Sequence, residues 1–295
     1  MKPLNPLISW RRGALAGLLL CCMIAPVRGS GDSDRLLERF QKMVRSNLDT
    51  SHVVASDRLD AAMRLFQDLP LGERVAAWAS WFADLGGIEY RYGRGPGGYV
   101  TEGRICQDDS TDCVLFMYRV TELARSTSAE EAVQFAFGTR FYGASIDQAV
   151  RDDGTVDYDN EAHLEYSEDM IHSEIWGKDV TESVGLSLEE LGGIKYVPSA
   201  SIEYGALQNG DIIWFVGDPA GTALGSEADP ESPPTVVQHV GILDRRRGEV
   251  DLVHAAARPI LGVYDHPGVV RIPLQAYLHR VDRFRGIVVT RLVEF

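Results

Sequence analysis

The run Ser110-Thr111-Asp112-Cys113-Val114-Leu115-Phe116 decides how the rest of the chain is interpreted. Ser, Thr and Asp accept hydrogen bonds from the unpaired N–H groups of a helix start, and all three types stand directly before the cysteine. Apolar residues at helical spacing then follow, namely Val114, Leu115, Phe116, Met117, Val120 and Leu123. The run therefore predicts a helix that carries Cys113 in its first turn.

The position of Cys113 suits a thiolate nucleophile. A thiol at a helix start feels the positive end of the helix dipole, and the free N–H groups beside it can hold an oxyanion. Two other interpretations stay open from this stretch alone. Cys113 would then be a buried structural cysteine, or it would form a disulfide with Cys106 that silences the thiol.

Composition limits the class of protein. A chain of 295 residues with 45% hydrophobic residues can bury a full core, and its length favours one or two domains. Acidic residues outnumber basic residues by 43 to 29, which gives a formal charge of −14. Because phosphate binding needs clustered positive charge, we expect no nucleic acid partner.

The first residues have the layout of a signal peptide. Basic residues precede an apolar run over residues 14–25, and the small residues Gly29 and Ser30 follow. The run is short for a membrane span, so we expect residues 1–29 to be cleaved and no stable span to remain. The predicted location is therefore outside the cytoplasm, periplasmic or secreted.

Cleavage would change the charge and the cysteine content of the protein. Four basic residues would leave, Lys2, Arg11, Arg12 and Arg28, so the formal charge would fall from −14 to −18. Only Cys106 and Cys113 would remain as cysteines. The Arg11-Arg12 pair keeps twin-arginine export open as the route, and the run Leu18-Leu19-Leu20-Cys21 keeps a lipoprotein signal open.

Hydrophobic periodicity predicts helices first and strands second. Helices are expected over residues 34–44, 57–66, 73–85, 113–123, 128–136 and 161–176, the last capped by Asn160. Strands are expected over residues 211–216, 239–243, 250–255 and 286–292. This order predicts an α+β fold. An acidic, proline-rich loop over residues 217–235 is expected to be a lid or a disordered insertion.

The predicted domain organisation has three parts. Residues 1–29 are the signal peptide, residues 30–70 are an N-terminal helical extension, and residues 71–295 form one domain. We expect the extension to pack on the domain; a cover over the active-site cleft is the alternative.

Two histidines lie on strands that should form a hairpin. If Leu243 faces Val250 across a loop over residues 245–248, then His239 faces His254. Directly opposite residues share one face of the sheet, with Cβ atoms ~5 Å apart. A one-residue bulge would turn one imidazole to the other face.

These histidines complete a set of groups for thiol catalysis. Such catalysis needs a nucleophile, a base that takes its proton, and a polar group that orients the base. We assign Cys113, His239 and His254 to these roles in that order. His254 would hydrogen-bond the far nitrogen of His239 and fix its tautomer.

The sequence resembles the NlpC-type superfamily of papain-like cysteine peptidases, which cut peptidoglycan. The matching segments are Tyr90-Arg91-Tyr92-Gly93, Asp112-Cys113, Asn209-Gly210-Asp211-Ile212-Ile213, His239-Val240-Gly241-Ile242 and Val253-His254-Ala255. Residues 158–181 more closely resemble an N-acetylmuramoyl-L-alanine amidase-like branch, known as a domain of unknown function. The resemblance covers roughly residues 72–292.

The resemblance implies a papain-like core whose nucleophile helix packs on an antiparallel sheet. It implies that Tyr90 helps to polarise the scissile carbonyl and that His163 and Asp169 border the substrate cleft. Asp112, directly before the nucleophile, joins this oxyanion and substrate-binding group. We expect no cofactor and no metal ion.

The predicted function is that of an exported cysteine amidohydrolase acting on peptidoglycan or a muropeptide. The bond cut would lie between muramic acid and L-alanine or between D-glutamate and the diamino acid. One alternative is a non-catalytic wall-binding module, and another is an acyltransferase or hydrolase with the same triad. A zinc amidase using His163, His239 or His254 is the third, although no HExxH-type ligand pair is present.

Overall fold

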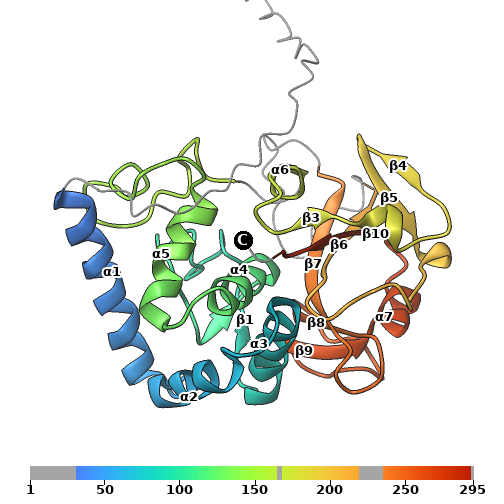
Figure 1. Ribbon diagram of the computed structural model, residues 1–295, viewed down its shortest axis with the longest axis horizontal. Coiled ribbons are helices and arrows are strands. Elements are labelled where there is room, and N and C mark those ends of the chain that lie inside the picture. The colour runs from blue at the N-terminus through green and yellow to red at the C-terminus, as the bar shows by residue number, and fades with distance from the viewer. Residues whose placement is uncertain (1–30, 165–167, 219–234, 294–295) are drawn as a thin grey trace, which may run out of the picture.

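The computed structural model describes residues 31–164, 168–218 and 235–293, with most of the helices on one side and a large sheet on the other (Figure 1). The helices are α1 (Gly31–Thr50), α2 (Ser56–Phe66), α3 (Leu71–Leu85), α4 (Cys113–Ala124), α5 (Ala129–Arg140), α6 (Glu168–His172) and α7 (Leu274–Arg280), with single 3-10 turns at Thr181–Ser183 and Ser199–Ser201. The strands are β1 (Glu89–Tyr90), β2 (Ser110–Thr111), β3 (Lys178–Asp179), β4 (Glu189–Leu191), β5 (Ile194–Pro198), β6 (Ile212–Gly217), β7 (Val237–Asp244), β8 (Asp251–Ala256), β9 (Gly268–Pro273) and β10 (Phe284–Arg291). The predicted α+β class is confirmed.

One antiparallel sheet forms the second half of the molecule. Its strand order is β4-β5-β10-β6-β7-β8-β9, and β3 pairs with β10. Four of these strands, β6, β7, β8 and β10, lie where the sequence predicts them. The predicted loop over residues 217–235 falls for the most part outside the described residues.

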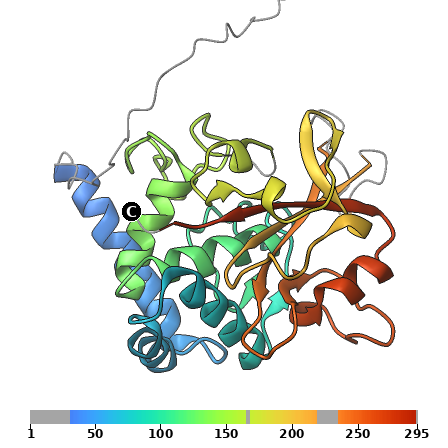
Figure 2. The ribbon, with the colours of Figure 1, turned by 45° about the vertical axis from the view of Figure 1, so that its right-hand side comes forward.

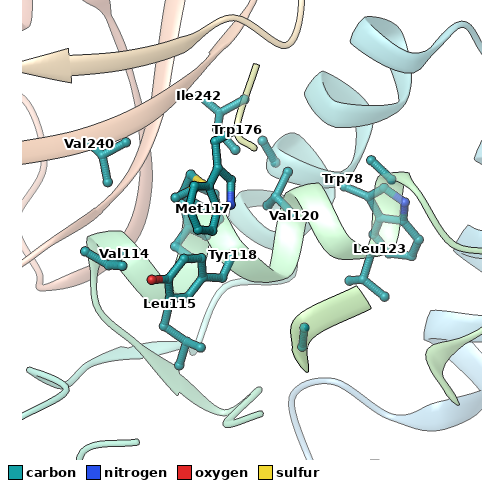
Figure 3. Packing of buried hydrophobic residues seen from close by; sticks show 14 of the residues in the cluster. Trp78, Val114, Leu115, Met117, Tyr118, Val120, Leu123, Trp176, Val240 and Ile242 are labelled. Carbon is teal, nitrogen blue, oxygen red and sulfur yellow. The ribbon is translucent and has the colours of Figure 1, made fainter. Parts of the chain in front are cut away.

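Helix α4 is buried between the other helices and the sheet (Figure 3). Every residue from Val114 to Ala124 is buried, as expected of a helix that is covered all round. Trp78 of α3 lies on one side of α4, and Val240 and Ile242 of β7 lie on the other. The first residue of α4, Cys113, is thereby held at the place where this helix meets β7.

The opposite face of the sheet has a core of its own. Phe215 of β6, Leu252 of β8 and Phe284 of β10 pack there with Tyr277 of α7. Because side chains alternate along a strand, β7 directs Val240 to the α4 side and Leu243 to the α7 side.

The N-terminal extension packs on the domain, as expected. Helix α1 lies along α5, where the rings of Phe40 and Phe137 are 5.1 Å apart (Figure 2). Helix α2 contacts α3 through Phe66 and Trp78, at 5.2 Å. These helices therefore share the core of the domain.

The helix predicted over residues 161–176 is wrong, since among the described residues of this range, 161–164 and 168–176, only α6 is helical. Asn160 instead makes a tight turn in which its Oδ1 accepts the N–H of Ala162 at 2.9 Å. The N–H of Leu164 then bonds the carbonyl of Arg140, at the end of α5, at 3.0 Å. This hydrogen bond to a residue distant in the sequence outweighs the helical preference of residues 161–164.

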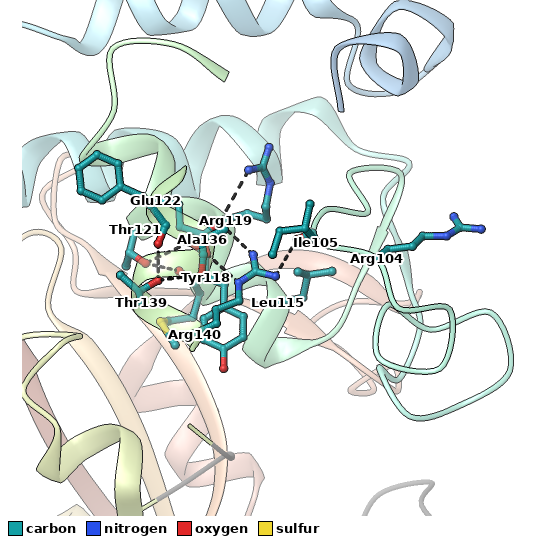
Figure 4. Close-up of polar contacts among 12 residues, drawn as sticks. Arg104, Ile105, Leu115, Tyr118, Arg119, Thr121, Glu122, Ala136, Thr139 and Arg140 are labelled. Carbon is teal, nitrogen blue, oxygen red and sulfur yellow. Dashed lines mark hydrogen bonds and ion pairs between the residues drawn. The ribbon is translucent and has the colours of Figure 1, made fainter. Parts of the chain in front are cut away.

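A buried ion pair ties α4 to α5 (Figure 4). The Arg140 guanidinium bonds both carboxylate oxygens of Glu122, at 2.8 and 2.9 Å. It also donates to the Ile105 carbonyl at 2.6 Å and to the Tyr158 hydroxyl at 3.0 Å. Both charged side chains are at most 1% exposed, so the pair fixes the helix that carries the candidate nucleophile.

Replacing Glu122 by Gln should lower the free energy of unfolding by about 3 kcal/mol, because the guanidinium of Arg140 would stay buried without its counter-charge. Chemical denaturation measures this loss. The matched control is Glu38→Gln, which removes an exposed carboxylate that pairs with Lys42 and should leave the midpoint nearly unchanged. Equal midpoints for both variants would contradict a structural role for the buried pair.

Candidate active site

Asp112 joins the start of α4 to the segment that carries Tyr90. Its carboxylate accepts the N–H of Leu115 at 2.8 Å, which caps the helix, and the N–H of Gly93 at 2.9 Å. A Cβ atom on Gly93 would lie 2.4 Å from the ring of Tyr99 and 2.9 Å from this carboxylate, so the approach requires glycine. The parallel pairing of β1 with β2 sets Tyr90 beside Thr111.

Cys113 combines a helix start with a desolvated position. The backbone N–H groups of Val240, Cys113 and Val114 point at the thiol and favour its ionised form. Burial outweighs them, and with the nearby charge of Asp112 it raises the thiol pKa to about 12. The sequence predicts a nucleophile at this position, with His239 as the base that takes its proton. In the structure the resting group is a neutral thiol that needs a base.

His239 and His254 are in direct contact. His239 Nε2 and His254 Nδ1 are 2.7 Å apart, and the two rings are nearly perpendicular at 86°. One N–H therefore lies between the two rings. In the tautomer in which Nε2 of His239 carries that proton, Nδ1 of His239 has the free lone pair that can accept a proton from a nucleophile.

The register of the hairpin differs from the prediction by two residues. Leu243 faces Leu252 and not Val250, because the turn is longer than expected. An even shift keeps every side chain on its face, so His239 and His254 become diagonal neighbours on one face. The absence of a side chain at Gly241 leaves room for His254 on the neighbouring strand, since a Cβ at Gly241 would lie 3.0 Å from the Cβ of His254.

Both imidazoles are neutral at ordinary pH. Burial lowers the pKa of His254 to about 3. Burial also holds the pKa of His239 well below 6.5, and the adjacent His254 and Arg283 lower it further. A neutral imidazole has the lone pair that a general base requires.

Aromatic rings that sequence reasoning missed surround the histidine pair. The Tyr277 ring lies 4.7 Å from His254 and 6.1 Å from His239. Phe284 stacks on His239 at 6.2 Å with an angle of 16°, and Phe215 lies 5.6 Å from it. These rings come from three separate elements, so no local pattern links them to the histidines.

Tyr90 borders the nucleophile, while His163 packs against aromatic rings and Asp169 is exposed. Burial raises the pKa of Tyr90, and Cys113 and Asp112 add to the rise, so its hydroxyl stays a proton donor. The ring of His163 packs on Phe141 and Tyr158, at 5.3 and 5.0 Å. Asp169 is exposed in the first turn of α6.

The remaining alternatives concern disulfides, metals and membranes. Cys106 and Cys113 are both free thiols, so the disulfide is not formed. Within the part of the chain that the structure describes, no three His, Cys, Asp or Glu side chains gather as metal ligands. None of the helices in residues 31–164, 168–218 and 235–293 has the length and apolarity to cross a bilayer.

Comparison with known proteins gives a match in fold alone. No protein-family model matches the sequence, and no curated protein matches it. An N-acetylmuramoyl-L-alanine amidase from Bacteroides uniformis is similar in structure, with 19% identity, a TM-score of 0.51 and coverage of 76% of this chain and 99% of the other. Protein LPG0564 from Legionella pneumophila, of the family DUF1460, has 14% identity, a TM-score of 0.58 and coverage of 81% and 94%. The chain therefore has an amidase-like α+β fold.

Loss of the Asp112 carboxylate should loosen the helix start. Asp112→Ala leaves two backbone N–H groups without an acceptor, so we expect the free energy of unfolding to fall by about 2 kcal/mol and alkylation of Cys113 by iodoacetamide to change in rate. Ser128→Ala is the matched control, because Ser128 caps α5 through Glu131 N at 3.1 Å. It should cost about 1 kcal/mol and leave the alkylation rate unchanged; a change in both variants would contradict the role of Asp112 at the nucleophile.

His163 should make stability depend on pH. Both ring nitrogens are buried and have no hydrogen-bond partner within the part of the chain that the structure describes. Burial lowers the pKa of His163 from 6.5 to about 4. The unfolded chain then binds the proton more tightly, so stability falls as pH drops from 6.5 to 4. His163→Phe should remove about 3 kcal/mol of this dependence, measured by denaturation at both pH values. An unchanged pH profile would contradict burial of a neutral imidazole.

Proposed function

We propose that the protein is an exported cysteine amidohydrolase of peptidoglycan that uses Cys113, His239 and His254. The observation that carries the proposal is the 2.7 Å contact between His239 and His254, together with a thiol at a capped helix start that receives the backbone N–H of Val240, the residue next to His239. Nucleophile, base and orienting group are the set that thiol catalysis needs.

Attack on the amide would begin with transfer of the Cys113 proton to Nδ1 of His239. The sulfur then bonds the carbonyl carbon, and the N–H groups of Cys113 and Val114, with the Tyr90 hydroxyl, stabilise the oxyanion. The C–N bond breaks as His239 returns the proton to the leaving amine. Water, activated by His239, hydrolyses the thioester and restores the thiol.

His254 would act by positioning the base. Its Nδ1 engages His239 Nε2, which leaves Nδ1 of His239 for the substrate side. When His239 becomes an imidazolium, its Nε2–H donates to the lone pair of His254 and so spreads the positive charge. A neutral partner of this kind helps only while His254 itself stays unprotonated, which its pKa of about 3 favours.

Two observations support peptidoglycan as the substrate. One is the amidase-like fold shared with the Bacteroides uniformis protein, whose name describes cleavage between muramic acid and L-alanine. The other is the signal-peptide layout of residues 1–29, which would take the protein to the cell wall. The muramic acid–L-alanine bond and the D-glutamate–diamino acid bond are the two candidate sites of cleavage.

Digestion of purified peptidoglycan under reducing conditions tests the proposal. Wild-type protein and Cys106→Ala should release the same fragments, because Cys106 is buried and its thiol pKa is raised to about 12. Cys113→Ala should release none, and mass spectrometry of the fragments identifies the bond. Absence of fragments from the wild type, together with an unreactive Cys113, would favour a non-catalytic wall-binding module.

A further inference from the structure

Arg283 lies one ring away from the candidate base. It directly precedes β10, and its guanidinium carbon lies 4.5 Å from the centroid of the Phe284 ring. That ring is stacked on the His239 imidazole, with 6.2 Å between centroids. The positive charge of Arg283 is therefore part of the immediate surroundings of His239.

No carboxylate within residues 31–164, 168–218 and 235–293 neutralises this guanidinium. Its Nε is buried and has no hydrogen-bond partner among the described residues, while the residue as a whole keeps part of its surface accessible. Neighbouring arginines of β10 behave differently. Arg285 bonds both oxygens of Asp218 at 2.8 and 2.6 Å, and Arg291 bonds both oxygens of Asp211 at 2.7 and 2.8 Å.

An unpaired, partly desolvated arginine is unexpected in a chain with 43 acidic residues, because many carboxylates are available to pair with it. Taking a charge out of water is unfavourable unless a partner compensates. The field of Arg283 reaches His239, whose pKa it helps to lower. It also opposes the rise that burial causes in the pKa values of Tyr90, Tyr264 and Tyr277. The substrate is therefore the natural source of a negative charge that would neutralise the Arg283 guanidinium.

We propose that Arg283 binds a carboxylate of the substrate beside Cys113 and His239. A guanidinium offers two parallel N–H donors that match the two oxygens of a carboxylate. The substrate class is then a peptide with a free carboxylate close to the scissile amide. This assignment of the substrate rests on the proposed function, whereas the anion site itself does not.

Two alkylating reagents of similar size test the anion site without any peptidoglycan. Iodoacetate is anionic and iodoacetamide is neutral, and both modify Cys113. Arg283→Gln should lower the ratio of the iodoacetate rate to the iodoacetamide rate by about five- to tenfold, because the attraction between the reagent's charge and the guanidinium is lost. Arg283→Lys, which keeps the charge, should retain most of the wild-type ratio.

Arg285→Gln is the matched control, since it makes the same change of net charge two residues away at a paired, exposed arginine. It should leave the ratio unchanged. In the wild type, sodium chloride at about 0.5 M should lower the ratio by screening the attraction, which gives a readout even if Arg283→Gln does not fold. A ratio that responds to neither Arg283→Gln nor salt, or that falls equally in Arg285→Gln, would overturn the proposal.

Matched peptides extend the test to the substrate. A peptide with a carboxylate near the scissile amide should show a KM raised about tenfold in Arg283→Gln, and its carboxamide analogue should show no change. If neither peptide is cleaved while the reagent ratio behaves as expected, the proposed function fails and the anion site stands. If both are cleaved and both KM values are unaffected, the carboxylate assignment is wrong.

Discussion

Two backbone N–H groups, from Gly93 and Leu115, converge on the buried carboxylate of Asp112, and the candidate site depends on this convergence. One contact caps α4 and so fixes where Cys113 lies. The other holds the segment that carries Tyr90 against the same point. Burial raises the pKa of the Asp112 carboxyl, so the molecule sustains an unfavourable environment for this group. Its two hydrogen bonds position the start of α4, the Cys113 thiol and Tyr90 relative to one another.

The second half of the site comes from the sheet. The β7–β8 pairing places His239 and His254 on the face that α7 covers, while Val240 supplies a backbone N–H to the thiol from the same strand. Both imidazoles are buried and Cys113 is half-buried, and the resulting desolvation favours the neutral forms of all three groups. Catalysis would therefore start from an uncharged pair and create charge only during attack, where the surrounding N–H groups and the phenol can stabilise it.

Short stretches of sequence correctly predicted the features that depend only on residues close together in the chain. Asp112 as a cap and the strand that carries His239 follow from residue types a few positions apart. The predicted hairpin register was wrong by two residues, because the alternation of apolar and polar residues does not show how long the loop is. The prediction that the two histidines share one face still holds, because a shift by an even number of residues keeps each side chain on its face. The missed contributions of Tyr277 and Arg283 depend on α7 and β10 folding back on β7, and no short-range pattern reports that contact.

The pH dependence of Cys113 alkylation tests the central claim, that His239 takes the proton of this thiol, most directly. For a neutral thiol paired with a neutral base, the population of the reactive ion pair does not change with pH between the two pKa values. The iodoacetamide rate of the wild type should then be flat from about pH 6 to about pH 9. In His239→Ala the rate should rise about tenfold per pH unit over that range. A wild-type rate that rises with the same slope as the variant would contradict the account.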